Sequence, residues 1–348
     1  MVAFANRPRL PRPTGTLPVG TSVVALDAFT TEGKPIVGCI WYPSESDRGP
    51  HAAYALGATG LSVRDRLVSA IVRTNARRNS AARAGRAPVI VYVPGLGGRR
   101  FNNTALAQEL ASHGYVVVAV DDTQPSVGFD FGSEAGIQRT LIEGDRKVRL
   151  QARDIENVID ALAKLNTSPS SVLNNRLALR RVGVLGFSFG GAVAAEIARS
   201  DRRVAAAVDL DGSIFGDARL DGVTKPFLFM TGRNEVESVF EQAFDRENMG
   251  SIVRGLERHG GYMVTIDGMD HLNFSDAGVL PSLRHTGVGP IDGARGSGII
   301  ARHVLRFFDR YLGGGTVRSF GGAEMIDPAV TFRAFGAKRQ ASAGFASK

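Results

Sequence analysis

The sequence predicts an α/β fold, in which a mostly parallel central sheet carries helices on both of its faces. From residue 87 onward, short apolar runs alternate with longer stretches whose apolar residues recur at helical spacing. Several of the apolar runs have no polar residue at alternate positions, as expected for strands that are covered on both faces. The chain has 348 residues, of which 43% are hydrophobic, and this suffices for a sizeable core.

Glycine, proline and polar clusters bound the expected elements. Residues 1–20 form an arm rich in Arg and Pro, and we expect a single domain over residues 21–348. Pro43 ends the second strand, and Gly114 ends the first helix of the core. We expect strands at residues 22–26, 37–42, 88–93, 115–120, 181–185, 204–210, 226–230, 262–266 and 330–335. We expect helices at residues 102–113, 145–165, 190–200, 240–259 and 299–312.

Most of the net positive charge lies in one segment. The chain has 42 Lys and Arg against 34 Asp and Glu, a net charge of +8, and residues 61–90 hold seven arginines against one aspartate. Helical spacing of the apolar residues there predicts a basic helical insertion at about residues 61–86. The apolar positions are Val63, Leu67, Val68, Ile71 and Val72, and the arginines on the other faces are Arg64, Arg66, Arg73 and Arg77. We favour packing of this helix on its own domain, and the alternative is weak, salt-sensitive contact with anionic membrane surfaces.

The composition excludes several classes of protein. A single Cys excludes a disulfide framework and a cysteine-built zinc site, and we expect neither a metal nor a cofactor. No aromatic RNA-binding signature or zinc-finger spacing accompanies the basic charge, so we expect no nucleic-acid partner. No apolar run approaches the roughly 18 residues of a membrane helix. The N-terminus lacks the apolar core of a signal peptide, which predicts a cytoplasmic protein or a secreted one whose leader has been removed.

A serine lies at a sharp turn between an apolar strand and an Ala-rich helix. Residues 186–191 read Gly-Phe-Ser-Phe-Gly-Gly and contain the pattern Gly-x-Ser-x-Gly. Gly186 and Gly190 lack a Cβ, so strand and helix can approach closely while Ser188 is held exposed above the sheet. The N-terminus of the helix directs free N–H groups toward a developing negative charge. Ser188 is therefore the predicted nucleophile, with a plain tight turn as the alternative.

A serine nucleophile needs a neighbouring base at neutral pH. His271 follows the strand at residues 262–266 after a short loop, which places it at the same carboxyl edge of the sheet as Ser188. The other five histidines lie before the core, at helix ends, in a loop or within a helix, where surface or capping roles are expected. His271 is the predicted base, and the alternative is a loop histidine bonded to Asp270.

The third member of such a group is a carboxylate that orients the imidazole. Asp211 lies just past the strand at residues 204–210, which follows the helix after Ser188, whereas Asp209 lies two residues earlier, within that strand. The next strand leads to Asn234, where an Asp is commonest, and to Glu235 beside it. The residues alone leave Asp211 and Glu235 as equal candidates.

A Gly-rich segment follows the first core strand. Residues 93–98 read Val-Pro-Gly-Leu-Gly-Gly, and the backbone N–H groups of Leu96 and Phe189 are the predicted donors to an oxyanion. The segment lacks the Lys-Ser/Thr ending of a phosphate-binding loop. The phenylalanines near these motifs are expected to line an acyl pocket, with the core as their alternative place, and they are Phe101, Phe187 and Phe274.

Together these motifs resemble the α/β-hydrolase superfamily and, more narrowly, the plasma-type platelet-activating-factor acetylhydrolase family with its bacterial esterase relatives. The stretches that carry the resemblance are residues 10–15, 17–21, 40–43, 95–97, 111–115, 186–191, 209–212 and 271–276. That family takes its acid from the strand end after the elbow helix, so the resemblance selects Asp211. The chain departs from the family at Pro94, where a histidine commonly precedes Gly-Leu-Gly.

The resemblance implies a serine carboxylic-ester hydrolase that forms an acyl-enzyme and needs no metal or cofactor. It assigns the nucleophile to Ser188, the base to His271 and the acid to Asp211. Its substrates are expected to be short-acyl esters or lipid esters. The alternatives are a polyester hydrolase or lipase of the same fold, and a binding protein of that fold without catalytic activity.

Overall fold

The computed structural model describes residues 8–232, 239–280, 286–313, 320–321 and 326–336. Its strands are β1 (Val19–Phe29), β2 (Pro35–Pro43), β3 (His51–Ala53), β4 (Arg73–Arg78), β5 (Ala87–Val93), β6 (Val116–Val120), β7 (Leu177–Phe187), β8 (Val204–Leu210), β9 (Phe227–Thr231), β10 (Gly261–Ile266) and β11 (Val330–Phe335). Its helices are α1 (Val63–Ile71), α2 (Thr104–Ser112), α3 (Glu134–Thr167), α4 (Phe189–Ser200), α5 (Asp217–Asp221), α6 (Val239–His259) and α7 (Gly293–Tyr311).

All eleven of these strands belong to one sheet, in the order β11-β10-β9-β8-β7-β5-β6-β2-β1-β4-β3. The central pairs from β6 through β5, β7, β8 and β9 to β10 are parallel, and antiparallel pairs join β2 to β6 and β11 to β10. The expected mostly parallel sheet is confirmed. Because the central strands are parallel, the loops that follow β5, β7, β8, β9 and β10 meet at one edge.

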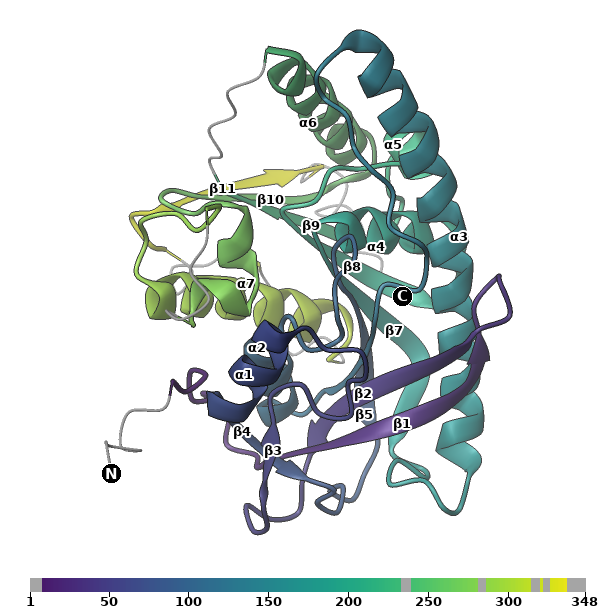
Figure 1. The fold of residues 1–348 in the computed structure, drawn as a ribbon, viewed down its shortest axis with the longest axis vertical. Coiled ribbons are helices and arrows are strands. Elements are labelled where there is room, and N and C mark those ends of the chain that lie inside the picture. The colour runs from purple at the N-terminus through teal and green to yellow at the C-terminus, as the bar shows by residue number, and fades with distance from the viewer. Residues whose placement is uncertain (1–7, 233–238, 281–285, 314–319, 322–325, 337–348) are drawn as a thin grey trace, which may run out of the picture.

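Helices cover both faces of the sheet, with α3 and α4 on one side and α2 and α7 on the other (Figure 1). Alternate residues of a strand point to opposite faces of the sheet and pack into a separate hydrophobic core on each face. On β5, Val89, Val91 and Val93 pack under α3 and α4, whereas Ile90 and Tyr92 pack under α2 and α7. This two-sided burial explains the unbroken apolar runs of the sequence.

The basic insertion is only partly helical. Helix α1 ends at Ile71, and the expected continuation to Arg77 is wrong because the chain turns into strand β4. In β4 the buried Thr74 and Ala76 alternate with more exposed residues, a period of two that suits a strand and not a helix. The apolar stripe is also split, since Val68 and Val72 are buried while Val63, Leu67 and Ile71 are exposed.

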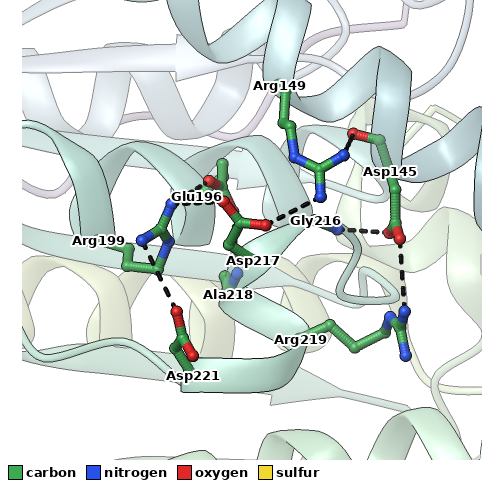
Figure 2. A network of polar contacts seen from close by, with 9 residues as sticks. All are labelled: Asp145, Arg149, Glu196, Arg199, Gly216, Asp217, Ala218, Arg219 and Asp221. Carbon is green, nitrogen blue, oxygen red and sulfur yellow. Dashed lines mark hydrogen bonds and ion pairs between the residues drawn. The ribbon is translucent and has the colours of Figure 1, made fainter.

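A charged network ties the nucleophile-bearing helix to its neighbours. Figure 2 shows side chains of α3 and α4 meeting the backbone and side chains at residues 216–221. The buried carboxylate of Glu196 accepts hydrogen bonds from Arg199 at 2.8 Å and from the backbone N–H of Ala218 at 2.9 Å. Arg199 also pairs with Asp217, which in turn accepts from Arg149 of α3. The network fixes α5 and α3 against the C-terminal half of α4.

Candidate active site

Ser188 stands at the turn between β7 and α4, as predicted. Its backbone has φ 55° and ψ −127°, a region that residues other than glycine rarely occupy and that is often stored strain at functional sites. A Cβ on Gly186 would lie 1.9 Å from the carbonyl oxygen of Gly190, and one on Gly190 would lie 2.1 Å from that of Val93. The two glycines are therefore required by close backbone approach, which explains the spacing of the motif.

His271 begins a 3-10 turn, His271–Phe274, after β10. Its Nε2 lies 2.9 Å from Ser188 Oγ, and its Nδ1 lies 2.8 Å from Asp211 Oδ2. With Nδ1 donating to the carboxylate, Nε2 is the acceptor for the serine hydroxyl. The ring of Phe187 stacks on the imidazole at a centroid distance of 5.0 Å and limits its rotation. The structure thus brings Ser188 and His271 together in the geometry that a nucleophile and base require.

Asp211 directly follows β8, with a positive φ of 57° that turns its side chain toward His271. Its Oδ1 accepts hydrogen bonds from Thr231 Oγ1 at 2.7 Å and from the N–H of Gly232 at 3.0 Å. Burial raises the pKa of Asp211, but the hydrogen bonds from His271, Thr231 and Gly232 outweigh it and hold that pKa below its usual value. The carboxyl is therefore ionised beside the imidazole. Glu235, the other candidate, lies outside the described residues.

Asp209 lies beneath the turn and takes no part in this group. Its carboxyl is fully buried, and its Oδ1 accepts from the N–H of Gly212 at 2.8 Å. Its Oδ2 has no hydrogen-bond partner among the residues that the structure describes. Desolvation by burial raises the pKa of Asp209 well above its usual value, which favours the neutral acid in the folded protein.

The neutral acid gives a pH-dependent stability. Above the pKa of an ordinary Asp, the folded state binds a proton at Asp209 that the unfolded state has lost, so stability falls as the pH rises. Asp209→Asn keeps the acceptor for Gly212 and removes the proton. Urea unfolding at pH 5 and at pH 8 gives the difference in the free energy of unfolding between the variant and wild type. We expect this difference to shift in favour of the variant between pH 5 and pH 8. A difference that does not change with pH would contradict a neutral Asp209.

The predicted oxyanion residues flank the serine. Leu96 lies in the loop after β5 and lines the pocket, and Phe189 is the first residue of α4, where backbone N–H groups lack partners within the helix. A Cβ on Gly95 would lie 2.9 Å from Ser188 Cβ, so this loop passes directly beside the nucleophile. Both residues lie beside Ser188, and their role as oxyanion donors stays a prediction.

A buried ion pair holds the oxyanion loop. Asp122 Oδ2 accepts from the N–H of Gly97 at 2.8 Å, and the N–H of Asp122 donates to the carbonyl of Gly98 at 3.0 Å. Lys147 of α3 lies 2.9 Å from both oxygens of Asp122, and the two side chains are only 3% and 4% exposed. Lys147 Nζ also lies 5.6 Å from the ring centroid of Phe189. One lysine therefore connects the elements that carry both predicted oxyanion donors, and no sequence motif pointed to it.

This pair is expected to show strong coupling. Asp122→Asn or Lys147→Met leaves one buried charge without its partner, which lowers the free energy of unfolding by about 3–5 kcal/mol. The double variant removes both charges and is expected to lose less than the sum of the two single variants. Urea unfolding of the three variants and wild type measures the coupling. Additive losses would mean that the pair does not act as a unit.

A second buried carboxyl fixes the segment after His271. Asp276 accepts from Tyr54 Oη at 2.9 Å, from the N–H of Thr104 at 2.8 Å and from that of Ala105 at 3.1 Å. These donors come from the segment directly after β3 and from the start of α2. Burial raises the pKa of Asp276 to about 7. The carboxyl joins the histidine segment to the helix that follows the oxyanion loop.

A pocket of about 380 Å³ opens over Ser188 and His271. Phe101 and Phe187 line it, as expected. Phe274 does not line it: the 3-10 turn directs its ring into the core beneath α7, where it is fully buried, so its expected pocket position is wrong. The lining residues that sequence reasoning missed are Tyr54, Asp65, Val68, Asn102, Leu272, Ser275 and Ala277. Three of them follow His271 closely in the chain, a proximity that could have found them.

Among the described residues, no group of three or more His, Cys, Asp or Glu side chains could hold a metal ion. None of the helices in the described part of the chain is long and apolar enough to cross a membrane.

The sheet order and the serine at the strand-to-helix turn are those of the α/β-hydrolase fold. Family models agree with this class. The model of the dienelactone hydrolase family matches residues 75–244, and that of platelet-activating factor acetylhydrolase, isoform II, matches residues 2–134.

Individual relatives are similar over most of the chain. Platelet-activating factor acetylhydrolase of Bos taurus is 25% identical over 90% of this chain and 80% of its own, and that of Canis lupus familiaris is 24% identical over 89% and 79%. A ferulic acid esterase from Streptomyces cinnamoneus has a similar structure, with a TM-score of 0.72 and 28% identity over 94% of this chain and 99% of its own. The chain is thus a carboxylic-ester hydrolase that resembles the platelet-activating-factor acetylhydrolases.

Proposed function

We propose that the protein hydrolyses carboxylic esters through an acyl-enzyme on Ser188. The observation that carries this proposal is the position of His271, within hydrogen-bond distance of Ser188 Oγ on one side and of Asp211 on the other. A binding protein without catalysis has no need of these three groups in register, and the named relatives are esterases and acetylhydrolases.

The steps follow from the geometry. Ser188 Oγ attacks the acyl carbon while its proton passes to His271 Nε2, and the ionised Asp211 stabilises the imidazolium. The N–H groups of Leu96 and Phe189 donate to the oxyanion of the tetrahedral intermediate. His271 then protonates the departing alkoxide, and the acyl group remains on Ser188. A water molecule then loses a proton to His271 and attacks the acyl carbon, and His271 returns that proton to Ser188 Oγ as the carboxylic acid leaves.

The substrate class is a short-acyl ester or a lipid ester with a short acyl chain. The pocket of about 380 Å³ is small, and Leu96, Phe101, Phe187 and Leu272 supply much of its apolar lining. The names of the relatives, an acetylhydrolase and a ferulic acid esterase, support short or compact acyl groups.

A chain-length series tests the substrate class. We expect kcat/KM for p-nitrophenyl esters to be highest for acetate to butyrate and to fall with longer acyl chains. A maximum at long chains, or efficient release of products from a polyester film, would instead favour a lipase or polyester hydrolase of the same fold.

We further propose that α1 makes weak contact with anionic membrane surfaces. Val63, Leu67 and Ile71 lie exposed at helical spacing, while Asp65 and Val68 of the same helix line the pocket. An apolar stripe beside the pocket, within a basic segment, suits an ester substrate that is embedded in a lipid surface.

Vesicle sedimentation tests this contact with a matched control. Leu67→Ser is expected to weaken binding to anionic vesicles, and added salt is expected to weaken wild-type binding. Ile142→Ser serves as the control, since Ile142 on α3 is 64% exposed and Leu67 is 61% exposed. Equal effects of the two substitutions would exclude α1 as the contact.

A further inference from the structure

A second, larger cavity lies apart from the ester pocket. Its volume is about 910 Å³, and its walls come from the N-terminal arm at residues 9–19, the strands β3 and β4, and the end of α1. Helix α1 stands between the two cavities, because Asp65 and Val68 line the ester pocket whereas Ser69, Ala70 and Val72 line the second cavity. We call this second cavity the basic groove.

Backbone pairing aligns cationic side chains along the groove. Arg73 and Arg77 lie four residues apart on β4 and therefore share one face of the strand. His51 of β3 is the direct cross-strand partner of Arg77, so its ring lies on the same face. The arm forms a parallel bridge from Arg9 to Arg73, and Arg12 lines the groove further along the arm.

Of the four arginines that line the groove, only Arg77 is paired with a carboxylate of the described residues. Asp47 is the one acidic residue in the lining, and it is paired with Arg77 at 2.9 Å. Arg9, Arg12 and Arg73 make no ion pair with the residues that the structure describes, and residues 1–7 contain no Asp or Glu.

The positive charges in the groove affect the pKa of His51. Desolvation lowers the pKa of His51 most, and the positive charge of Arg77 lowers it further, with a smaller contribution from Arg73. A backbone hydrogen bond at Thr74 and the charge of Asp47 oppose this shift without reversing it. The groove is thus a concave surface with a positive potential, which concentrates anions.

We propose that the basic groove binds an anion that carries several phosphate groups. Guanidinium groups match phosphate oxygens with two parallel hydrogen bonds. Arg9, Arg12 and Arg73, which make no ion pair with the described part of the chain, can together neutralise several negative charges. The volume of about 910 Å³ exceeds the space that a single phosphate needs. A free polyphosphate and a phosphorylated lipid headgroup share this chemistry. The site is independent of the ester hydrolysis proposed above.

Calorimetric titration of the full chain with tripolyphosphate at physiological salt tests the site. The double variant Arg12→Gln/Arg73→Gln is expected to raise Kd by about tenfold or more, since each substitution removes charge-assisted hydrogen bonds. The control Arg78→Gln/Arg83→Gln removes the same charge from residues that do not line the groove, and is expected to leave Kd within about twofold. Hydrolysis of p-nitrophenyl acetate and the melting temperature verify that both variants are folded.

A second readout comes from His51. Bound tripolyphosphate is expected to raise the pKa of His51, as followed by the NMR shifts of its ring protons, because the anion offsets the arginine charges. Vesicles that contain phosphatidic acid separate the two sources: binding of vesicles but not of tripolyphosphate, lost in Arg12→Gln/Arg73→Gln, assigns the site to a lipid headgroup. Binding of neither probe, or equal losses in the two double variants, would overturn the proposal.

Discussion

Replacing Ser188 by alanine is expected to lower kcat for p-nitrophenyl acetate by about 10⁴- to 10⁶-fold, because the acyl group then has no oxygen to which it can transfer. The pocket and the predicted oxyanion donors stay in place, so KM is expected to change little. Stopped-flow release of p-nitrophenol measures both constants. The structure predicts this result from the 2.9 Å contact between Ser188 and His271.

Ser200→Ala is the matched control for this variant. Ser188 lies immediately before the first residue of α4, and Ser200 is the last residue of the same helix, on the surface. We expect the control to retain wild-type rates. Equal rates in Ser188→Ala and wild type would remove the acyl-enzyme from the account.

Asp211→Asn is expected to lower kcat by about 10⁴-fold, because an amide favours the wrong imidazole tautomer and cannot stabilise the imidazolium. Glu235→Gln is expected to change kcat by less than about threefold, as is usual for a side chain outside the reacting group. Initial rates with p-nitrophenyl acetate at pH 8 compare the two. Thermal unfolding verifies that each variant is folded.

Comparing Asp211→Asn with Glu235→Gln separates the two assignments, because each assignment makes a different carboxylate the partner of His271. A larger loss in Glu235→Gln than in Asp211→Asn would transfer the role of the acid to Glu235. Equal large losses would mean that both carboxylates support His271. We expect neither of these two outcomes, because Asp211 already bonds to His271, Thr231 and Gly232.

The parts that the sequence predicted depend on short-range patterns. The turn around Ser188 combines a motif of five residues with the strand and helix that it requires, and close backbone approach at Gly186 and Gly190 explains it fully. The place of His271 follows from the rule that parallel strands end at one edge of the sheet. The residues alone did not choose between Asp211 and Glu235, because each follows a neighbouring strand.

The parts that the sequence missed depend on contacts between distant segments. Lys147 of α3 reaches Asp122 in the loop after β6, and Tyr54 reaches Asp276 across most of the chain. The helical prediction for the basic insertion failed beyond Ile71. There the burial of side chains changes to the period of two that is typical of a strand, and the spacing of apolar residues in the sequence did not show this change. Phe274 was misplaced because chain proximity to His271 does not determine the direction of a side chain in a 3-10 turn.

Covalent trapping of Ser188 tests the central claim most directly. A fluorophosphonate forms a stable adduct with an activated serine, and peptide mass spectrometry identifies the residue that carries it. We expect one adduct per chain, on the peptide that contains Ser188, together with complete loss of ester hydrolysis. Loss of activity with the adduct on another residue, or full activity after Ser188 is modified, would contradict it.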